Sequence, residues 1–200
     1  MTGAESLKVF GYGSLLWNPG FDYEQKTFAR LDGHHRAFCR LSVRHRGTPE
    51  KPGMVVGLKP GGSCQGICYT VSGRNRASVL KYLDEREGAG YRRELVRLEA
   101  LQAAADSSEK NPAVVGDSNA QSPVMIQAYT YLPEEDHPTY APDLGEDETV
   151  ALIAHGVGNS GRARDYLKEL VEHLHRLGID EPEFERMWSR IQEIPARATP

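Results

Sequence analysis

Residues 10–20, Phe-Gly-Tyr-Gly-Ser-Leu-Leu-Trp-Asn-Pro-Gly, are the first segment whose composition suits chemistry. Gly11 and Gly13 flank Tyr12 directly after a segment of strand-like composition. Two glycines around a tyrosine let the backbone turn with its N–H groups directed outward. Such a turn can bind an anion or a developing oxyanion without a charged side chain. An ordinary tight turn has the same spacing, so both interpretations stand at this point.

A second candidate lies at residues 83–92, Leu-Asp-Glu-Arg-Glu-Gly-Ala-Gly-Tyr-Arg, where a predicted helix ends in charged residues. A carboxylate at a helix C-terminus meets the unfavourable end of the macrodipole, which together with burial raises its pKa toward neutrality. A carboxyl group with such a pKa can serve first as general base and then as general acid. The alternative is a solvated cluster of charges.

Two other patterns lack the context that their chemistry needs. Gly156 to Gly161 match G-x-G-x-x-G, but a dinucleotide fold needs that loop before repeated βαβ units, and only 39 residues follow Gly161. Ser14 lacks the glycine two residues later that a nucleophile elbow requires, because Leu16 stands there. We therefore expect neither a dinucleotide site nor a catalytic serine.

Metal ligation is not favoured either. Cys64 and Cys68 lie four residues apart in a strand-like segment, which places them roughly 13 Å apart, too far to share one ion. His34 and His35 are adjacent, and no two of the seven histidines stand at i, i+4 on a predicted helix. We expect core thiols and no metal.

The elements that must position these groups are mostly short strands. Strand-like composition covers residues 7–12, 36–43, 54–58, 65–71, 93–101 and 125–132. Glycine and proline clusters, including residues 59–63, predict the connections. Helical periodicity covers residues 75–86, a longer stretch between Gly161 and Gly178, and a last short helix around residues 184–191. The composition of residues 102–122 predicts a flexible surface excursion. Together these elements predict an α+β chain with an irregular, antiparallel-rich sheet.

Composition excludes several classes of partner. The chain has 200 residues, enough for one domain spanning residues 1–200, and its net charge of −4 gives no basic field for nucleic acid or anionic lipid. No apolar run has the length of a membrane span or a signal peptide. With three cysteines, an odd number, these features predict a cytoplasmic protein. The sequence carries no signal for an oligomeric state.

Five short segments in order resemble the ChaC-like γ-glutamylcyclotransferases, in their glutathione-specific branch. They are residues 9–20, residues 45–53 (His-Arg-Gly-Thr-Pro-Glu-Lys-Pro-Gly), residues 61–66 (Gly-Gly-Ser-Cys-Gln-Gly), residues 82–87 (Tyr-Leu-Asp-Glu-Arg-Glu) with Gly90 and Tyr91, and Ser160-Gly161 before Asp165-Tyr166-Leu167. The resemblance extends from Val9 to about Ile179. It departs from the family pattern at Asn159, where proline is usual, and at Ala163, where asparagine is usual.

The resemblance implies a mixed α+β fold around a small β-barrel with flanking helices, including C-terminal helices at about 162–192. It implies cleavage of glutathione to 5-oxoproline and cysteinylglycine without metal or cofactor. The catalytic carboxylate then corresponds to Glu87, while Glu85 occupies a variable place in the motif. The substrate-binding residues correspond to Tyr12, Gly13, Ser14, Leu15 and Tyr166.

These residues suit such a reaction because the substrate carries its own nucleophile. Its α-amine attacks its own γ-amide carbonyl and closes a five-membered ring, a geometry worth about 7 kcal/mol or more when the bent conformer is held. Two alternatives remain: a cyclotransferase for other γ-glutamyl amines or amino acids, and a non-catalytic module that binds γ-glutamyl compounds.

Overall fold

The computed structural model describes residues 5–101 and 122–195. Five strands close into a barrel in the order β1-β3-β2-β4-β5. Their bounds are Leu7–Gly11 (β1), Gln25–Ser42 (β2), Gly53–Val71 (β3), Tyr91–Ala100 (β4) and Met125–Pro133 (β5). Every neighbouring pair is antiparallel except β1 with β5, which meet in parallel at Val9 and Tyr129. The expected α+β barrel with flanking helices is confirmed.

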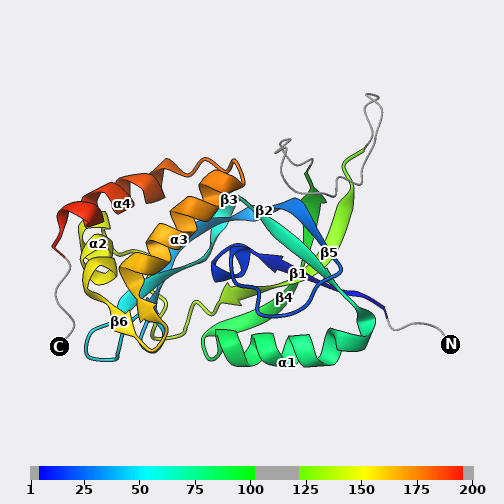
Figure 1. The fold of residues 1–200 in the computed structure, drawn as a ribbon, viewed down its shortest axis with the longest axis horizontal. Coiled ribbons are helices and arrows are strands. Elements are labelled where there is room, and N and C mark those ends of the chain that lie inside the picture. Colours follow the sequence, from blue (N-terminus) through cyan, green and yellow to red (C-terminus); the bar gives the residue numbers. More distant parts are fainter. Residues whose placement is uncertain (1–4, 102–121, 196–200) are drawn as a thin grey trace.

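The helices cover the barrel from two sides (Figure 1). Helix α1 (Arg76–Glu87) lies along one side, and α2 (Glu146–His155), α3 (Ala163–Arg176) and α4 (Pro182–Glu193) gather on the other. Two 3-10 turns, η1 (Ser14–Leu16) and η2 (Gly73–Asn75), and a hairpin of β6 (Val157–Gly158) and β7 (Gly161–Arg162) complete the described elements. Among these residues, no helix has the length and apolar character needed to cross a membrane.

The long hairpin of β2 and β3 departs from expectation. Residues 54–58 and 65–71 were expected as two strands joined by a loop at residues 59–63, which is wrong, because β3 runs unbroken through them. Gly61 and Gly62 both have positive φ, which lets the backbone follow β2 through a register shift between Asp32 and His34. Strand β2 likewise begins eleven residues before the expected position 36.

Apolar periodicity explains the helices that hold the site. In α3 the buried residues recur at helical spacing and pack against the barrel core: Ala163, Tyr166, Leu167, Leu170, Val171 and Leu174. In α1 only Val79 and Leu83 are buried, in a second cluster with residues of β1 and β5. The expected excursion at residues 102–122 falls almost wholly outside the described residues.

Helix α2 was not expected from the sequence, although a signal for it exists. Three acidic residues, Glu146, Asp147 and Glu148, occupy its first turn, where the positive end of the helix dipole favours them. The glycine pattern at residues 156–161 forms the β6–β7 hairpin ahead of α3. Two helices, α3 and α4, follow this hairpin.

Candidate active site

Glu87 is the last residue of α1, and the chain leaves the helix through two glycines. Gly88 caps the helix with φ +66°, and Gly90 has φ +85°, conformations that other residues adopt only with strain. The side chain of Glu87 is 20% exposed, whereas that of Glu85 is 68% exposed. The helix end therefore turns one carboxylate inward and leaves the other in solvent.

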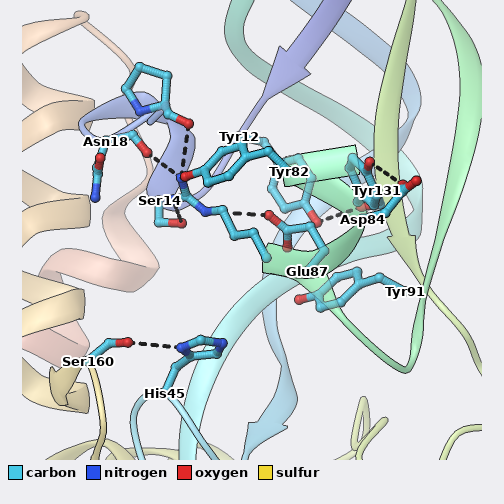
Figure 2. Close-up of polar contacts among 12 residues, drawn as sticks. Tyr12, Ser14, Asn18, His45, Tyr82, Asp84, Glu87, Tyr91, Tyr131 and Ser160 are labelled. Atoms are coloured by element: carbon cyan, nitrogen blue, oxygen red, sulfur yellow. Dashed lines mark hydrogen bonds and ion pairs between the residues drawn. The ribbon is translucent and has the colours of Figure 1, made fainter. Parts of the chain in front are cut away.

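Three tyrosines surround the Glu87 carboxyl group, and burial, reinforced by the charge of Glu87, raises the pKa of each of them. They come from the turn after β1 (Tyr12), from β4 (Tyr91) and from α3 (Tyr166). Burial raises the pKa of Glu87 itself, and the guanidinium groups of Arg86 and Arg40 oppose that rise. Figure 2 shows Glu87 between Tyr12 and Tyr91. Burial and a raised pKa are the properties expected of a carboxyl group that acts as general acid and base.

Two of the three tyrosine hydroxyls already donate a hydrogen bond within the protein. The Tyr12 hydroxyl donates to the backbone oxygen of Tyr131 at 2.8 Å, and the Tyr91 hydroxyl donates to that of Val56 at 3.3 Å. The Tyr166 hydroxyl instead accepts a hydrogen bond from the backbone N–H of Val56. Its own proton has no acceptor within residues 5–101 and 122–195, so it can be donated to a ligand.

The turn after β1 forms η1, in the place where either an anion-binding turn or an ordinary tight turn was expected. Its backbone hydrogen bonds come from Leu16, whose N–H donates to Gly13 at 2.9 Å, and from Trp17 and Asn18, which donate to Ser14. The N–H groups of Ser14 and Leu15 begin the turn and have no acceptor in the described part of the chain. The Cβ that Gly13 lacks would lie 3.1 Å from the Tyr166 hydroxyl, which brings this turn against α3.

Arg86 connects the turn to the carboxylate. Its guanidinium donates to the Ser14 hydroxyl at 2.9 Å and to the backbone oxygens of Asn18 and Pro19 at 2.7 and 3.0 Å. Its Nε lies 3.9 Å from a Glu87 oxygen (Figure 2). One side chain thus fixes the spacing between the free N–H groups and Glu87.

The structure brings the expected site residues Tyr12, Gly13, Ser14, Leu15, Tyr166 and Glu87 to one place. Sequence reasoning missed Arg86 and the parts played by Arg40 and Tyr91. The sequence offered a signal for Tyr91, because this residue follows Glu87 within a glycine-flanked turn. It offered none for the contact of Arg86 with Ser14, which lies 72 residues away in the chain. The side chain of Leu15 is buried.

Cysteine and histidine chemistry lies elsewhere. Cys39, Cys64 and Cys68 are free and buried, and burial raises the pKa of each thiol to about 11. Cys64 and Cys68 are the core thiols that were expected, and Cys39 is a third. In the described residues no group of three His, Cys, Asp or Glu side chains is placed to hold a metal ion.

Comparison with known proteins gives consistent likenesses. A family model described as ChaC-like protein matches residues 7–193. The chain is 34% identical over 176 residues to the glutathione-specific gamma-glutamylcyclotransferase 1 of Danio rerio, covering 87% of this chain and 82% of that protein. It is 27% identical over 192 residues to the glutathione-specific gamma-glutamylcyclotransferase of Escherichia coli K12, covering 96% and 75%.

Solved structures show the same fold. The crystal structure of a γ-glutamyl cyclotransferase specific to glutathione from yeast aligns with a TM-score of 0.79 at 22% sequence identity. The alignment covers 94% of this chain and 96% of that one, so the likeness includes the barrel and the helices on both of its sides.

Proposed function

The chain belongs to the ChaC-like family, and we propose that it is a glutathione-specific γ-glutamylcyclotransferase in which Glu87 transfers the protons of the reaction. The curated relatives named above carry that activity in their names. The observation that carries the assignment to residues is the burial of Glu87 beside a turn with free N–H groups.

The first step is the activation of the substrate amine. At neutral pH the α-amine of the γ-glutamyl group is an ammonium ion, and it must lose a proton before it can attack. Glu87 accepts that proton, because burial brings the pKa of its carboxyl group nearer to neutrality. The amine nitrogen then bonds to the γ-carbonyl carbon and closes the five-membered ring.

The second step places negative charge on the γ-carbonyl oxygen. The N–H groups of Ser14 and Leu15 and the hydroxyl proton of Tyr166 are the donors available to it. One such donor is worth roughly 3 kcal/mol in the transition state. The pKa of Tyr166 is raised by burial, so its hydroxyl stays protonated and keeps the proton that it donates.

Collapse of the tetrahedral intermediate breaks the bond between the γ-carbon and the cysteinyl nitrogen. The two protons that the attacking nitrogen loses reappear on the leaving nitrogen, which departs as the ammonium group of cysteinylglycine. Glu87 returns a proton in this step, so one carboxyl group serves as base and then as acid. The ring product is 5-oxoproline.

The cell compartment follows from the proposed substrate. Glutathione is a thiol, and the three cysteines of this chain are unpaired in the structure. We place the reaction in the cytoplasm, where thiols stay reduced.

The test is incubation of the protein with glutathione and chromatographic analysis for 5-oxoproline and cysteinylglycine. We expect Glu87→Gln to lower kcat by about 10²- to 10⁴-fold, because glutamine keeps the size of the side chain and cannot accept a proton. Glu85→Gln is the matched control on the same helix, with activity like that of the wild type. Turnover by Glu87→Gln above a few per cent of wild type would place the base elsewhere. Faster turnover of γ-glutamyl-alanine than of glutathione would favour the rival substrate class.

A further inference from the structure

Three arginines, Arg40, Arg44 and Arg46, alternate along residues 40–46, and the structure separates them. Arg40 is buried and donates to the backbone oxygens of Gly90 and Ala89 at 2.9 and 3.1 Å. Its guanidinium also lies 4.5 Å from the centre of the Tyr91 ring. Arg40 therefore holds the turn after Glu87 and is not reached by a ligand. Arg44 is exposed, so only Arg46 of the three is both half-buried and accessible.

Arg46 lies against the active site through Tyr166. Its guanidinium carbon is 5.5 Å from the centre of the Tyr166 ring, and Nη1 donates to the backbone oxygen of Arg162 at 3.1 Å. In the described residues no carboxylate comes within 4 Å of it. Its Nε and Nη2 also lack an acceptor in the described residues. Neither atom is buried, so solvent reaches both of them. This cation has donors to spare beside the catalytic tyrosine.

His45 and Ser160 continue the same surface. The His45 Nδ1 is 2.9 Å from the Ser160 hydroxyl, and the Ser160 N–H donates to the His45 backbone oxygen at 2.9 Å. Burial and the charges of Arg44, Arg46 and Arg86 lower the pKa of His45. In the view of Figure 2 this pair lies on the side of Glu87 where Ser14 lies, away from Asp84 and Tyr131. The charges of three arginines thus reach this surface, together with those of Asp165 and Glu169, which act on Arg46.

We propose that Arg46, with the side chains of His45 and Ser160 beside it, binds the C-terminal glycyl carboxylate of glutathione. This proposal rests on the proposed function and names the part of the substrate that the surface recognises. A guanidinium fork matches a carboxylate with two parallel hydrogen bonds. It gives the enzyme a physical reason to prefer a γ-glutamyl dipeptide over a γ-glutamyl amine.

The distances fit the substrate. The reacting γ-carbonyl and the glycyl carboxylate are separated by a cysteinylglycine unit, whose two residues span at most about 7 Å when extended. When the carbonyl oxygen accepts the hydroxyl proton of Tyr166, the far end of that unit reaches past the tyrosine ring. Arg46 stands over that ring, at 5.5 Å from its centre.

The experiment compares glutathione with its glycyl monoethyl ester, which keeps every group except the charged carboxylate. For the wild type we expect the KM of the ester to exceed that of glutathione by about 10- to 100-fold, with similar kcat. Arg46→Gln should raise the KM of glutathione to near that of the ester and leave the ester unchanged. Arg46→Lys keeps the charge without the fork and should give an intermediate KM. Arg44→Gln is the matched control, with changes below about twofold.

Three results would overturn the proposal. Equal KM values of the two substrates for the wild type would show that the carboxylate is not bound, and this comparison requires no variant to fold. An equal loss on both substrates in Arg46→Gln would mean that Arg46 only supports Tyr166. A wild type that turns over neither substrate would refute the proposed function and this inference with it, a pattern distinct from the other two.

Discussion

Arg36 offers the sharpest test of how the fold holds the turn at Tyr12. It lies in β2 with a side chain that is 0% exposed, and it joins three other parts of the chain. Its Nε donates to the Tyr12 backbone oxygen at 2.6 Å, and Nη2 donates to that of Gln65 in β3 at 2.5 Å. Nη1 pairs with Glu181, the residue that caps α4, whose side chain is 22% exposed.

Arg36→Met keeps an unbranched side chain and removes the charge and all three hydrogen bonds. Two backbone oxygens and the Glu181 carboxylate then lose their partner. Breaking a buried ion pair from one side costs about 3–5 kcal/mol, against a total stability of roughly 5–15 kcal/mol. At a typical urea dependence this lowers the denaturation midpoint by roughly 2 M. Urea titration followed by the fluorescence of Trp17 and Trp188 measures it.

The double variant Arg36→Met/Glu181→Gln separates the ion pair from the two backbone contacts. Removing both charges leaves no unpaired carboxylate, so we expect the double variant to lose less than the sum of the single losses, by at least about 1.5 kcal/mol. The exposed pairs of Arg190 with Glu146 and Asp147 give the control, and Arg190→Met should leave the urea midpoint close to that of the wild type. A loss under about 1 kcal/mol in Arg36→Met, or additive losses, would refute the reasoning.

Two further predictions concern the charge of Glu87. Because its pKa is raised by burial, the folded chain binds this proton more tightly than the unfolded chain, so Glu87 costs stability as pH rises above its ordinary pKa. Glu87→Gln should therefore melt at a higher temperature than the wild type at pH 7, with a difference that shrinks toward pH 4; a difference independent of pH would contradict this. Arg40→Met removes a cation that lowers the pKa of Glu87, so the acidic limb of the kcat/KM profile should move to higher pH. Arg30→Met, on the same strand and paired with Glu99, should leave that limb in place, and an unmoved limb in Arg40→Met would show that its charge does not reach Glu87.

Much of the site could be predicted because its parts are local. The Tyr12 turn and the end of α1 each lie within a dozen residues, and glycines at Gly13, Gly88 and Gly90 mark where the backbone must bend. Helix α3 was also predictable, since its apolar residues repeat at the helical period and Gly178 ends it with φ +67°.

What escaped prediction depends on contacts between distant residues. The segment at residues 59–63 has the composition of a loop, yet its two ends pair with β2, and no local signal records that partner. The same holds for Arg46, which has the composition of a solvated charge until the fold stacks it on Tyr166, 120 positions away. Arg36 is similar, because only the structure shows that its charge is buried.

The pairing of β3 has a consequence for how the molecule avoids its own copies. Within β3, only Ile67–Val71 pair with β1. Val56 of β3 pairs with β2 on one edge, and in the described sheet no strand pairs with it on the other edge. An exposed edge of this kind can pair with another chain. The Tyr166 hydroxyl accepts from the N–H of Val56, and the Tyr91 hydroxyl donates to its carbonyl oxygen. Next to it, a Cβ on Gly57 would lie 2.6 Å from the Pro133 side chain, so only glycine lets Pro133 come so close. The tyrosines that surround the Glu87 carboxyl group thus also occupy the unpaired edge of β3 at Val56, which leaves no free backbone group of that residue for another strand.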